Sequence, residues 1–175
     1  MTERQKFQVI QKYDRFEVRR YERCVIAEME INRDYSSATS AAFRDLFHYI
    51  SKGNQKSQSI AMTAPVIAAT DHSMDSEEWR VAFVMPDGSK LGDLPVPSDS
   101  KVRLVDLPPQ DCVALPFKGR ATQKLSELKE QELRALAAKV GLQLSSEIRI
   151  NRFDPPFKPW FLMYNEIVIP LRQQA

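Results

Sequence analysis

The segment Cys24-Val25-Ile26-Ala27 has a counterpart 88 positions further along the chain, Cys112-Val113-Ala114-Leu115. Each opens a stretch in which apolar side chains recur at every second position, which predicts a half-buried β-strand. A helical pattern and two more strand patterns follow each stretch, so the sequence contains two β-α-β-β units, at about 7–86 and 101–171. One such unit leaves a face of its sheet uncovered, and two must therefore close on each other. We expect one α+β domain over residues 1–175, with antiparallel strands curved into a barrel or saddle and a helix against each half.

Eight segments have the composition of β-strands. Asp14-Arg15 separates the first two as a hairpin turn. The fourth contains Pro65, which lacks a backbone N–H and so marks an edge or a bulge of the sheet. Residues 86–101, which include three prolines, form a connector. The predicted strands cover 7–11, 16–21, 25–31, 60–67, 79–85, 113–117 and 148–153, and the last lies inside 161–171.

Two segments have helical periodicity. The first is capped by Ser36 or Ser37 and ends at Gly53-Asn54, because both of the latter residues tolerate left-handed geometry. The second runs from about Thr122 to Val140 and is closed by Gly141. The apolar face of the first helix is predicted from side chains at i, i+3, i+4 and i+7, namely Phe43, Leu46, Phe47 and Ile50.

The charge balance is nearly even, with 25 Lys and Arg against 23 Asp and Glu and a net charge of +2. Nucleic-acid-binding proteins usually present a basic face, so no nucleic-acid partner is expected. No run of about 18 apolar residues occurs, and no membrane partner is expected. The first residues lead into no apolar signal segment, and two cysteines suit a reducing compartment, so we expect a cytoplasmic protein. The sequence leaves the oligomeric state open.

Motifs of common enzyme and metal sites are missing. The sequence has no glycine-rich phosphate loop, no nucleophile elbow and no zinc-protease motif. Cys24 and Cys112 also lack the paired spacing of a zinc site. We therefore expect neither an enzyme nor a metal site. The two cysteines are either a redox pair or small apolar residues of equivalent strands.

Three polar positions remain candidates for binding. His48 lies roughly 150° from the centre of the helical apolar stripe, and is either an exposed residue or a group beside a groove. Glu166 enters an apolar strand, and either faces outward or is a cavity carboxylate that holds a cation or acts as a base. Arg19-Arg20 is either solvated or a clamp for a phosphate or carboxylate.

Blocks along nearly the whole chain, roughly residues 8–171, resemble the SOUL haem-binding protein family. The specific ones are Met62–Val66 and Asp154-Pro155-Pro156 with Asn165-Glu166. The other similar blocks are Phe16–Tyr21, Tyr49-Ile50 with Gly53-Asn54, Trp79–Pro86, Leu94–Pro97, Phe117 with Gly119, Pro159-Trp160 and Ile167–Leu171. The resemblance implies a distorted antiparallel eight-stranded barrel with two helices, an architecture similar to the effector-binding domains of multidrug-sensing regulators.

The resemblance also implies a binding site. Some members carry a proposed axial histidine at the position of Arg20, and arginine does not ligate iron because its pKa is above about 12. Other members hold haem in an apolar groove along the first helix, where Phe47 matches a groove methionine and His48 a lysine near a propionate. The residues expected to hold haem are therefore Phe43, Phe47 and His48, with Arg20 as another partner for a propionate if it projects into the same groove. His48 would either ligate the iron or pair with a propionate.

These observations predict a non-catalytic carrier or buffer of haem or a related tetrapyrrole. The alternative is a general binding domain for aromatic or cationic small molecules. In that case Glu166 would face a central cavity, with Trp79, Trp160 and Tyr164 stacking on the ligand.

Overall fold

The computed structural model describes residues 2–173, and within them ten strands form one sheet. The order is β2-β3-β8-β10-β9-β5-β6-β4-β7, with antiparallel neighbours throughout, and β1 pairs with β5 in parallel. The strands are β1 (Glu3–Arg4), β2 (Phe7–Lys12), β3 (Glu17–Tyr21), β4 (Cys24–Ile31), β5 (Thr63–Thr70), β6 (Trp79–Val84), β7 (Arg103–Leu107), β8 (Gln110–Lys118), β9 (Ile148–Arg152) and β10 (Tyr164–Pro170).

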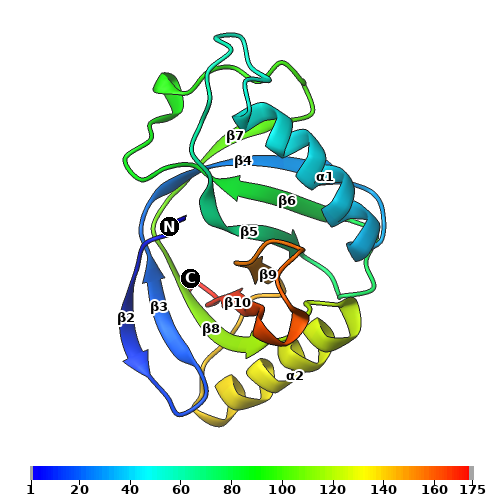
Figure 1. Ribbon diagram of the computed structural model, residues 1–175. Coiled ribbons are helices and arrows are strands. Elements are labelled where there is room, and N and C mark those ends of the chain that lie inside the picture. The colour runs from blue at the N-terminus through cyan, green and yellow to red at the C-terminus, as the bar shows by residue number, and fades with distance from the viewer. Residues whose placement is uncertain (1, 174–175) are drawn as a thin grey trace.

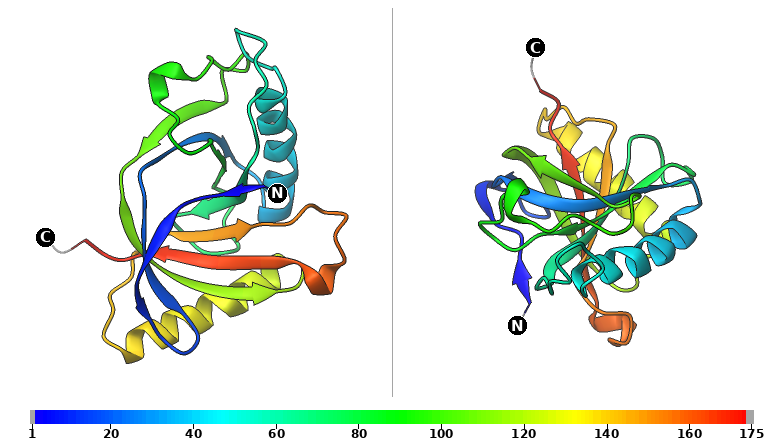
Figure 2. Two further views of the ribbon diagram at one scale, coloured as in Figure 1. Left: turned by 60° about the vertical axis from the view of Figure 1, so that its left-hand side comes forward. Right: turned by 90° about the horizontal axis from the view of Figure 1, so that it is seen from above.

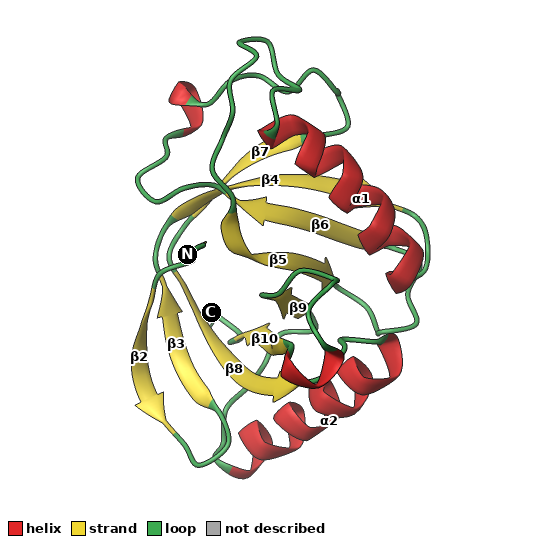
Figure 3. Ribbon diagram, viewed as in Figure 1, coloured by secondary structure: helices red, strands yellow, loops and turns green. Residues whose placement is uncertain are grey.

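The sheet curls into a half-barrel that carries two helices (Figures 1 and 3). Helix α1 (Tyr35–Ile50) packs on β4 and β6, and α2 (Gln123–Lys139) packs on β8 and β10. Two short 3₁₀ turns, η1 (Leu91–Asp93) and η2 (Trp160–Leu162), lie in the connections. The predicted fold class is thus confirmed. The described sheet is open, because β2 and β7 stand at opposite ends of its order.

The two halves are related in register as well as in order. Cys24 pairs with Leu107, and Cys112 pairs with Arg19, so the 88 positions that separate the cysteines also separate their partners. The strand that directly precedes the cysteine-containing strand of each half pairs with the other half. Thus β3 pairs with β8 of the second half, and β7 pairs with β4 of the first. A common offset in both ladders is the arrangement that two interlocked β-α-β-β units would produce.

All eight predicted strands are present, and two were missed. Strand β1 has two residues, which is too short to show a period, and β7 is a half-exposed edge strand after the proline-rich connector. Pro65 marks a bulge, as expected: the register of β5 against β6 shifts between Thr63 and Val66, and the Ala64–Pro65 peptide bond is cis.

The start of α1 differs from the prediction. Asp34 is the N-cap in place of Ser36 or Ser37, and its carboxylate accepts a 2.9 Å hydrogen bond from the amide of Ser37. An N-cap aspartate also interacts favourably with the positive end of the helix dipole. Helix α2 begins after Thr122, as expected, and Gly141 with φ of +79° follows its end.

The core lies on both faces of the curled sheet. Side chains from the helices and from one face of the strands form a continuous cluster that includes Leu46, Phe83, Leu133 and Ile167. Side chains alternate along a strand, so the remaining apolar residues fill the opposite, inner face. Two clusters occupy it, one around Tyr21 and Cys112, the other with Ile26, Ile67, Ala82 and Val84. The interior of the half-barrel is therefore largely filled by the chain's own side chains.

Candidate functional site

The outer surface of α1 carries an ordered pair of aromatic rings. Phe43 and Phe47 are one turn apart and lie nearly parallel, with centroids 6.0 Å apart and an interplanar angle of 10°. Phe43 contacts the buried ring of Phe83 edge-on at 5.3 Å, which anchors the pair to the core. Phe47 remains 48% exposed. The predicted apolar face is therefore wrong at Phe47, because the helix turns Leu46 and Ile50 inward and leaves this ring in solvent.

His48 lies next to Phe47, near the end of α1. A Cβ atom added to Gly53 would lie 2.4 Å from Cδ2 and 2.7 Å from Nε2 of the imidazole, so the ring covers this glycine. The backbone amide of Gly53 donates to the carbonyl of His48 at 2.8 Å. Within residues 2–173 the imidazole nitrogens make no hydrogen bond. The side chain is exposed, so an external group could reach it.

Arg44 is a member of this surface that sequence reasoning missed. It precedes Phe47 by three residues and His48 by four, and these spacings bring side chains together on a helix. Its guanidinium is strongly exposed, and Asp45 approaches it only to 3.8 Å. Helical spacing could have revealed Arg44, but the pattern of apolar residues gives no signal for a charged side chain.

Arg20 is not part of this group. It lies on β3, next to β2 and β8 in the sheet, whereas α1 packs on β4 and β6. Its guanidinium binds both carboxylate oxygens of Asp111, at 2.8 and 3.1 Å. The structure therefore separates Arg20 from Phe43, Phe47 and His48, and its charge is already balanced.

Glu166 lies inside the half-barrel and is only 3% exposed. Its two carboxylate oxygens accept hydrogen bonds from Nη1 and Nη2 of Arg19 at 2.9 and 2.8 Å. Tyr164 donates its hydroxyl to the same carboxylate at 2.7 Å. Arg19 also donates to Tyr21 at 3.0 Å and to Glu17 at 2.9 Å. A buried carboxylate needs a partner, and here the chain itself supplies it.

This network shifts the pKa values of its tyrosines. Burial, together with the hydrogen bond to Glu166, raises the pKa of Tyr164 to about 12. Burial likewise raises the pKa of Tyr21, although the nearby Arg19 opposes the shift. Burial would lower the pKa of Arg19, but its hydrogen bonds to Glu166 raise that pKa overall. Both tyrosines are neutral and Arg19 is charged at physiological pH.

The space beside this network is small. A cavity of about 80 Å³ is lined by Arg19, Glu166, Tyr164 and the amide of Asn151, whose Oδ1 has no hydrogen-bond partner. Sites that enclose a drug-sized ligand measure roughly 300–1,000 Å³. The carboxylate of Glu166 is moreover already paired with a guanidinium. A central cation site built on Glu166 is therefore not supported.

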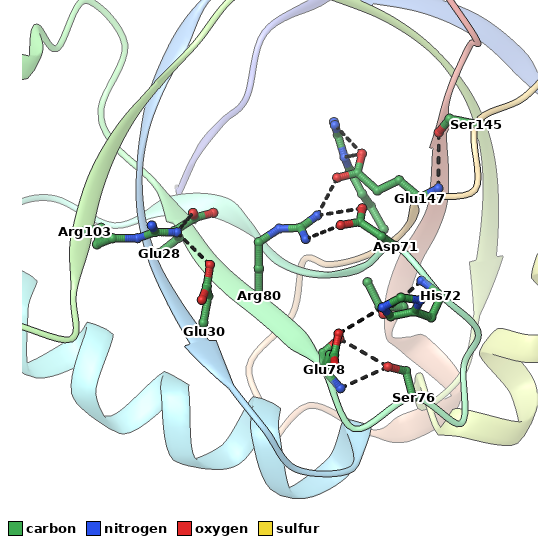
Figure 4. Close-up of polar contacts among 12 residues, drawn as sticks. Glu28, Glu30, Asp71, His72, Ser76, Glu78, Arg80, Arg103, Ser145 and Glu147 are labelled. Carbon is green, nitrogen blue, oxygen red and sulfur yellow. Dashed lines mark hydrogen bonds and ion pairs between the residues drawn. The ribbon is translucent and has the colours of Figure 1, made fainter.

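The two tryptophans lie apart from Glu166, contrary to the alternative hypothesis. Trp79 is buried and donates its Nε1–H to the carbonyl of Ser76 at 2.8 Å. It borders a second, polar hollow of about 250 Å³, where Arg80 binds Asp71 at 2.8 Å and His72 meets Glu78 at 2.9 Å. Figure 4 shows these pairs, and it also shows Arg80 bound to Glu147 at 2.8 Å, so the charged groups of this hollow are already paired within the chain. Trp160 is 61% exposed and lies between β9 and β10, lining neither hollow.

The cysteines behave as packed strand residues. Cys112 is buried, Cys24 is half-buried, and both thiols are free. Burial raises the pKa of Cys112 to about 11 and also raises that of Cys24. Residues 2–173 contain no group of three or more His, Cys, Asp or Glu side chains that could hold a metal ion. No helix in that part of the chain has the length and apolarity needed to cross a membrane.

Comparison with known proteins places the sequence among haem-binding relatives. The family model described as "SOUL heme-binding protein" matches residues 2–170. Two relatives named "Heme-binding protein 1", from Xenopus tropicalis and Xenopus laevis, are each 27% identical to the chain. Each match covers 86% of this chain and 84% of the relative.

Solved structures share the fold at low sequence identity. The C-terminal domain of EcmrR has a TM-score of 0.70 and 14% identity, with 96% of this chain and 99% of that domain covered. A structure described as a hydrolase from Listeria innocua has a TM-score of 0.59 and 13% identity, with 93% and 94% covered. Identity this low establishes the common architecture alone.

Proposed function

The chain belongs to the SOUL heme-binding protein family, and from this premise we propose that it binds haem or a related tetrapyrrole on the outer surface of α1. In this proposal it is a single-domain cytoplasmic carrier or buffer and catalyses no reaction. The two free thiols agree with a reducing compartment. Membership of the family supports haem or a related tetrapyrrole as the ligand. The geometry of α1 supports the outer surface of this helix as the place of binding.

The aromatic pair of Phe43 and Phe47 is the observation that carries this proposal. A porphyrin is a large flat apolar ring, and its burial against aromatic side chains is favourable without a bond to the metal. Phe47 offers such a surface, and its stacking on Phe43 fixes the orientation of the ring. The cavity beside Glu166 offers no comparable space, because it measures about 80 Å³.

The polar edge of haem has matching partners on the same helix. Its propionates are anionic, and the exposed guanidinium of Arg44 lies within one helical turn of Phe47 and His48. His48 could either join Arg44 at a propionate or ligate the iron through an imidazole nitrogen. Haem bound in this way would be carried without further chemistry.

A hemin titration followed by Soret absorbance tests the place of binding. We expect saturable one-to-one binding to the wild type and its loss in Phe47→Asp. Leu128→Asp is the matched control, because Leu128 is a similarly exposed apolar residue on α2. Equal loss in both variants would indicate non-specific adsorption, and full binding by Phe47→Asp would place the site elsewhere.

Metal-free protoporphyrin IX distinguishes the two roles of His48. Both rings carry propionates, but only hemin carries iron. If His48 pairs with a propionate, His48→Ala weakens the binding of hemin and of protoporphyrin IX to the same extent. If His48 ligates iron, the variant weakens the binding of hemin alone and shifts the Soret maximum of bound hemin. Unchanged binding of both would show that His48 takes no part.

A further inference from the structure

The connection between β9 and β10 holds four bulky apolar side chains in solvent. Phe157 is 87% exposed, Trp160 61%, Phe161 58% and Leu162 48%. In both views of Figure 2 the orange-red segment that contains them projects away from the rest of the fold. A contiguous group of exposed aromatic residues on a soluble domain usually marks a surface that contacts a partner.

The local backbone of this segment is constrained by prolines and by hydrogen bonds. Residues 153–163 include three prolines, whose fixed φ angles restrict the chain. The amide of Lys158 donates to the carbonyl of Pro155 at 3.1 Å, and the amide of Leu162 donates to that of Pro159 at 2.9 Å. At the base, the side chain of Asp154 accepts from the amide of Tyr164 at 2.6 Å and from Lys158 at 2.8 Å. Residues 155–162, called the apolar tip below, therefore have a conformation that the fold itself maintains.

Positive charges surround the base of this tip. Lys118 pairs with Tyr164 in the β8–β10 ladder, and Arg152 pairs with Asn165 in the β9–β10 ladder. Arg120 follows Gly119, whose amide donates to the carbonyl of Met163 at 3.1 Å. Within the described residues, Lys118, Arg120 and Arg152 form no ion pair. Asp154, the one nearby acid of the segment, is bound to Lys158.

We propose that residues 155–162 dock peripherally on an anionic lipid bilayer. Tryptophan and phenylalanine favour the boundary between headgroups and acyl chains, and lysine and arginine near them attract anionic headgroups. The sequence predicts no membrane partner because it lacks a spanning segment. A peripheral contact needs only an apolar tip with a cationic rim. This inference does not depend on haem binding.

Vesicle sedimentation and tryptophan fluorescence test the proposal on the full chain. The probe is a vesicle of roughly one part phosphatidylserine to two parts phosphatidylcholine. We expect the protein to sediment with it and its fluorescence to shift to the blue. The shift reports on Trp160, because Trp79 is already buried in the fold.

Variants then separate the apolar and cationic contributions. Phe157→Ser with Phe161→Ser should weaken partitioning about a hundredfold or more, since burying each of the two phenyl groups is worth at least about 1.4 kcal/mol, the equivalent of a factor of ten. Leu128→Ser, an exposed apolar residue of α2, is the matched control and should partition as the wild type does. Lys118→Glu with Arg120→Glu should weaken binding to the anionic vesicles, and added salt should do the same.

Three results would overturn the proposal. The first is absence of partitioning, and the second is equal loss in the tip variant and in Leu128→Ser. The third is reassignment of the tip to another partner. If Phe157→Ser with Phe161→Ser abolishes hemin binding or a concentration-dependent self-association, and vesicles do not bind, the tip belongs to the haem site or to an interface between copies.

Discussion

Replacing Glu166 by leucine would test whether the chain itself fills the interior of the half-barrel. The substitution removes two charged hydrogen bonds to Arg19 and the acceptor for Tyr164, and leaves a guanidinium that is almost fully buried. Breaking a buried ion pair in this way lowers the free energy of unfolding by about 3–5 kcal/mol. Glu17, which accepts from Nε of Arg19 and is itself partly exposed, compensates for only part of the loss.

The pair can be examined as a double-mutant cycle by urea unfolding, followed through the fluorescence of Trp79. Arg19→Met alone strands the carboxylate of Glu166, and we expect a loss of similar size. Arg19→Met with Glu166→Leu removes both charges, so it should be more stable than either single variant. Arg20→Met with Asp111→Leu is the control. Arg20 follows Arg19 on β3, but its ion pair with Asp111 is exposed, so its removal should change the free energy of unfolding little. Two results would refute the argument that Arg19 and Glu166 form one buried unit. In the first, the double variant loses as much free energy of unfolding as the two single variants together. In the second, Glu166→Leu is as stable as the wild type.

Three further predictions follow from individual positions. Gly53→Ala should lower the free energy of unfolding by about 1–3 kcal/mol and displace the imidazole of His48, because the new Cβ would lie 2.6 Å from the carbonyl oxygen of that histidine; a stability equal to wild type in a urea titration would contradict this. Folding raises the pKa of Tyr164 to about 12 from an ordinary value near 10, so its contribution to stability is complete below about pH 10 and is lost as the pH rises through 12. Stability should therefore fall less steeply over this interval in Tyr164→Phe, and an identical fall would argue against the assignment. Cys112, with a pKa of about 11, should resist iodoacetamide at pH 8 in the native protein while Cys24 reacts first, as mass spectrometry of the labelled peptides would reveal.

Periodicity predicted the elements of this fold well. Alternation identified eight strands, and the spacing of apolar residues located both helices. The repeated segments at Cys24 and Cys112 predicted the two related halves, and the structure adds that their ladder partners are separated by the same offset. These features follow from local patterns that a strand or helix imposes on its own sequence.

The candidate site was harder to predict, because it depends on rotation and on distant partners. Whether Phe47 is buried turns on a small rotation of α1 about its axis, and the core selected Leu46 and Ile50. Glu166 and Arg19 are separated by 147 residues, and no local pattern links them. The alternation of Glu17, Arg19 and Tyr21 along β3 does place three polar groups on one face. It does not reveal that they meet a carboxylate from β10.

Arg19 also shows why a shared architecture need not carry a shared ligand site. The half-barrel resembles the C-terminal domain of EcmrR with a TM-score of 0.70, yet only 14% of aligned residues are identical. In this chain the inner face places Arg19 against Glu166, with Phe7 4.0 Å from the guanidinium carbon. A cation, a carboxylate and an aromatic face are thus all supplied from within, and they satisfy one another. A ligand must then use surfaces that folding leaves unsatisfied, and among residues 2–173 the most exposed aromatic side chains lie on α1 and between β9 and β10.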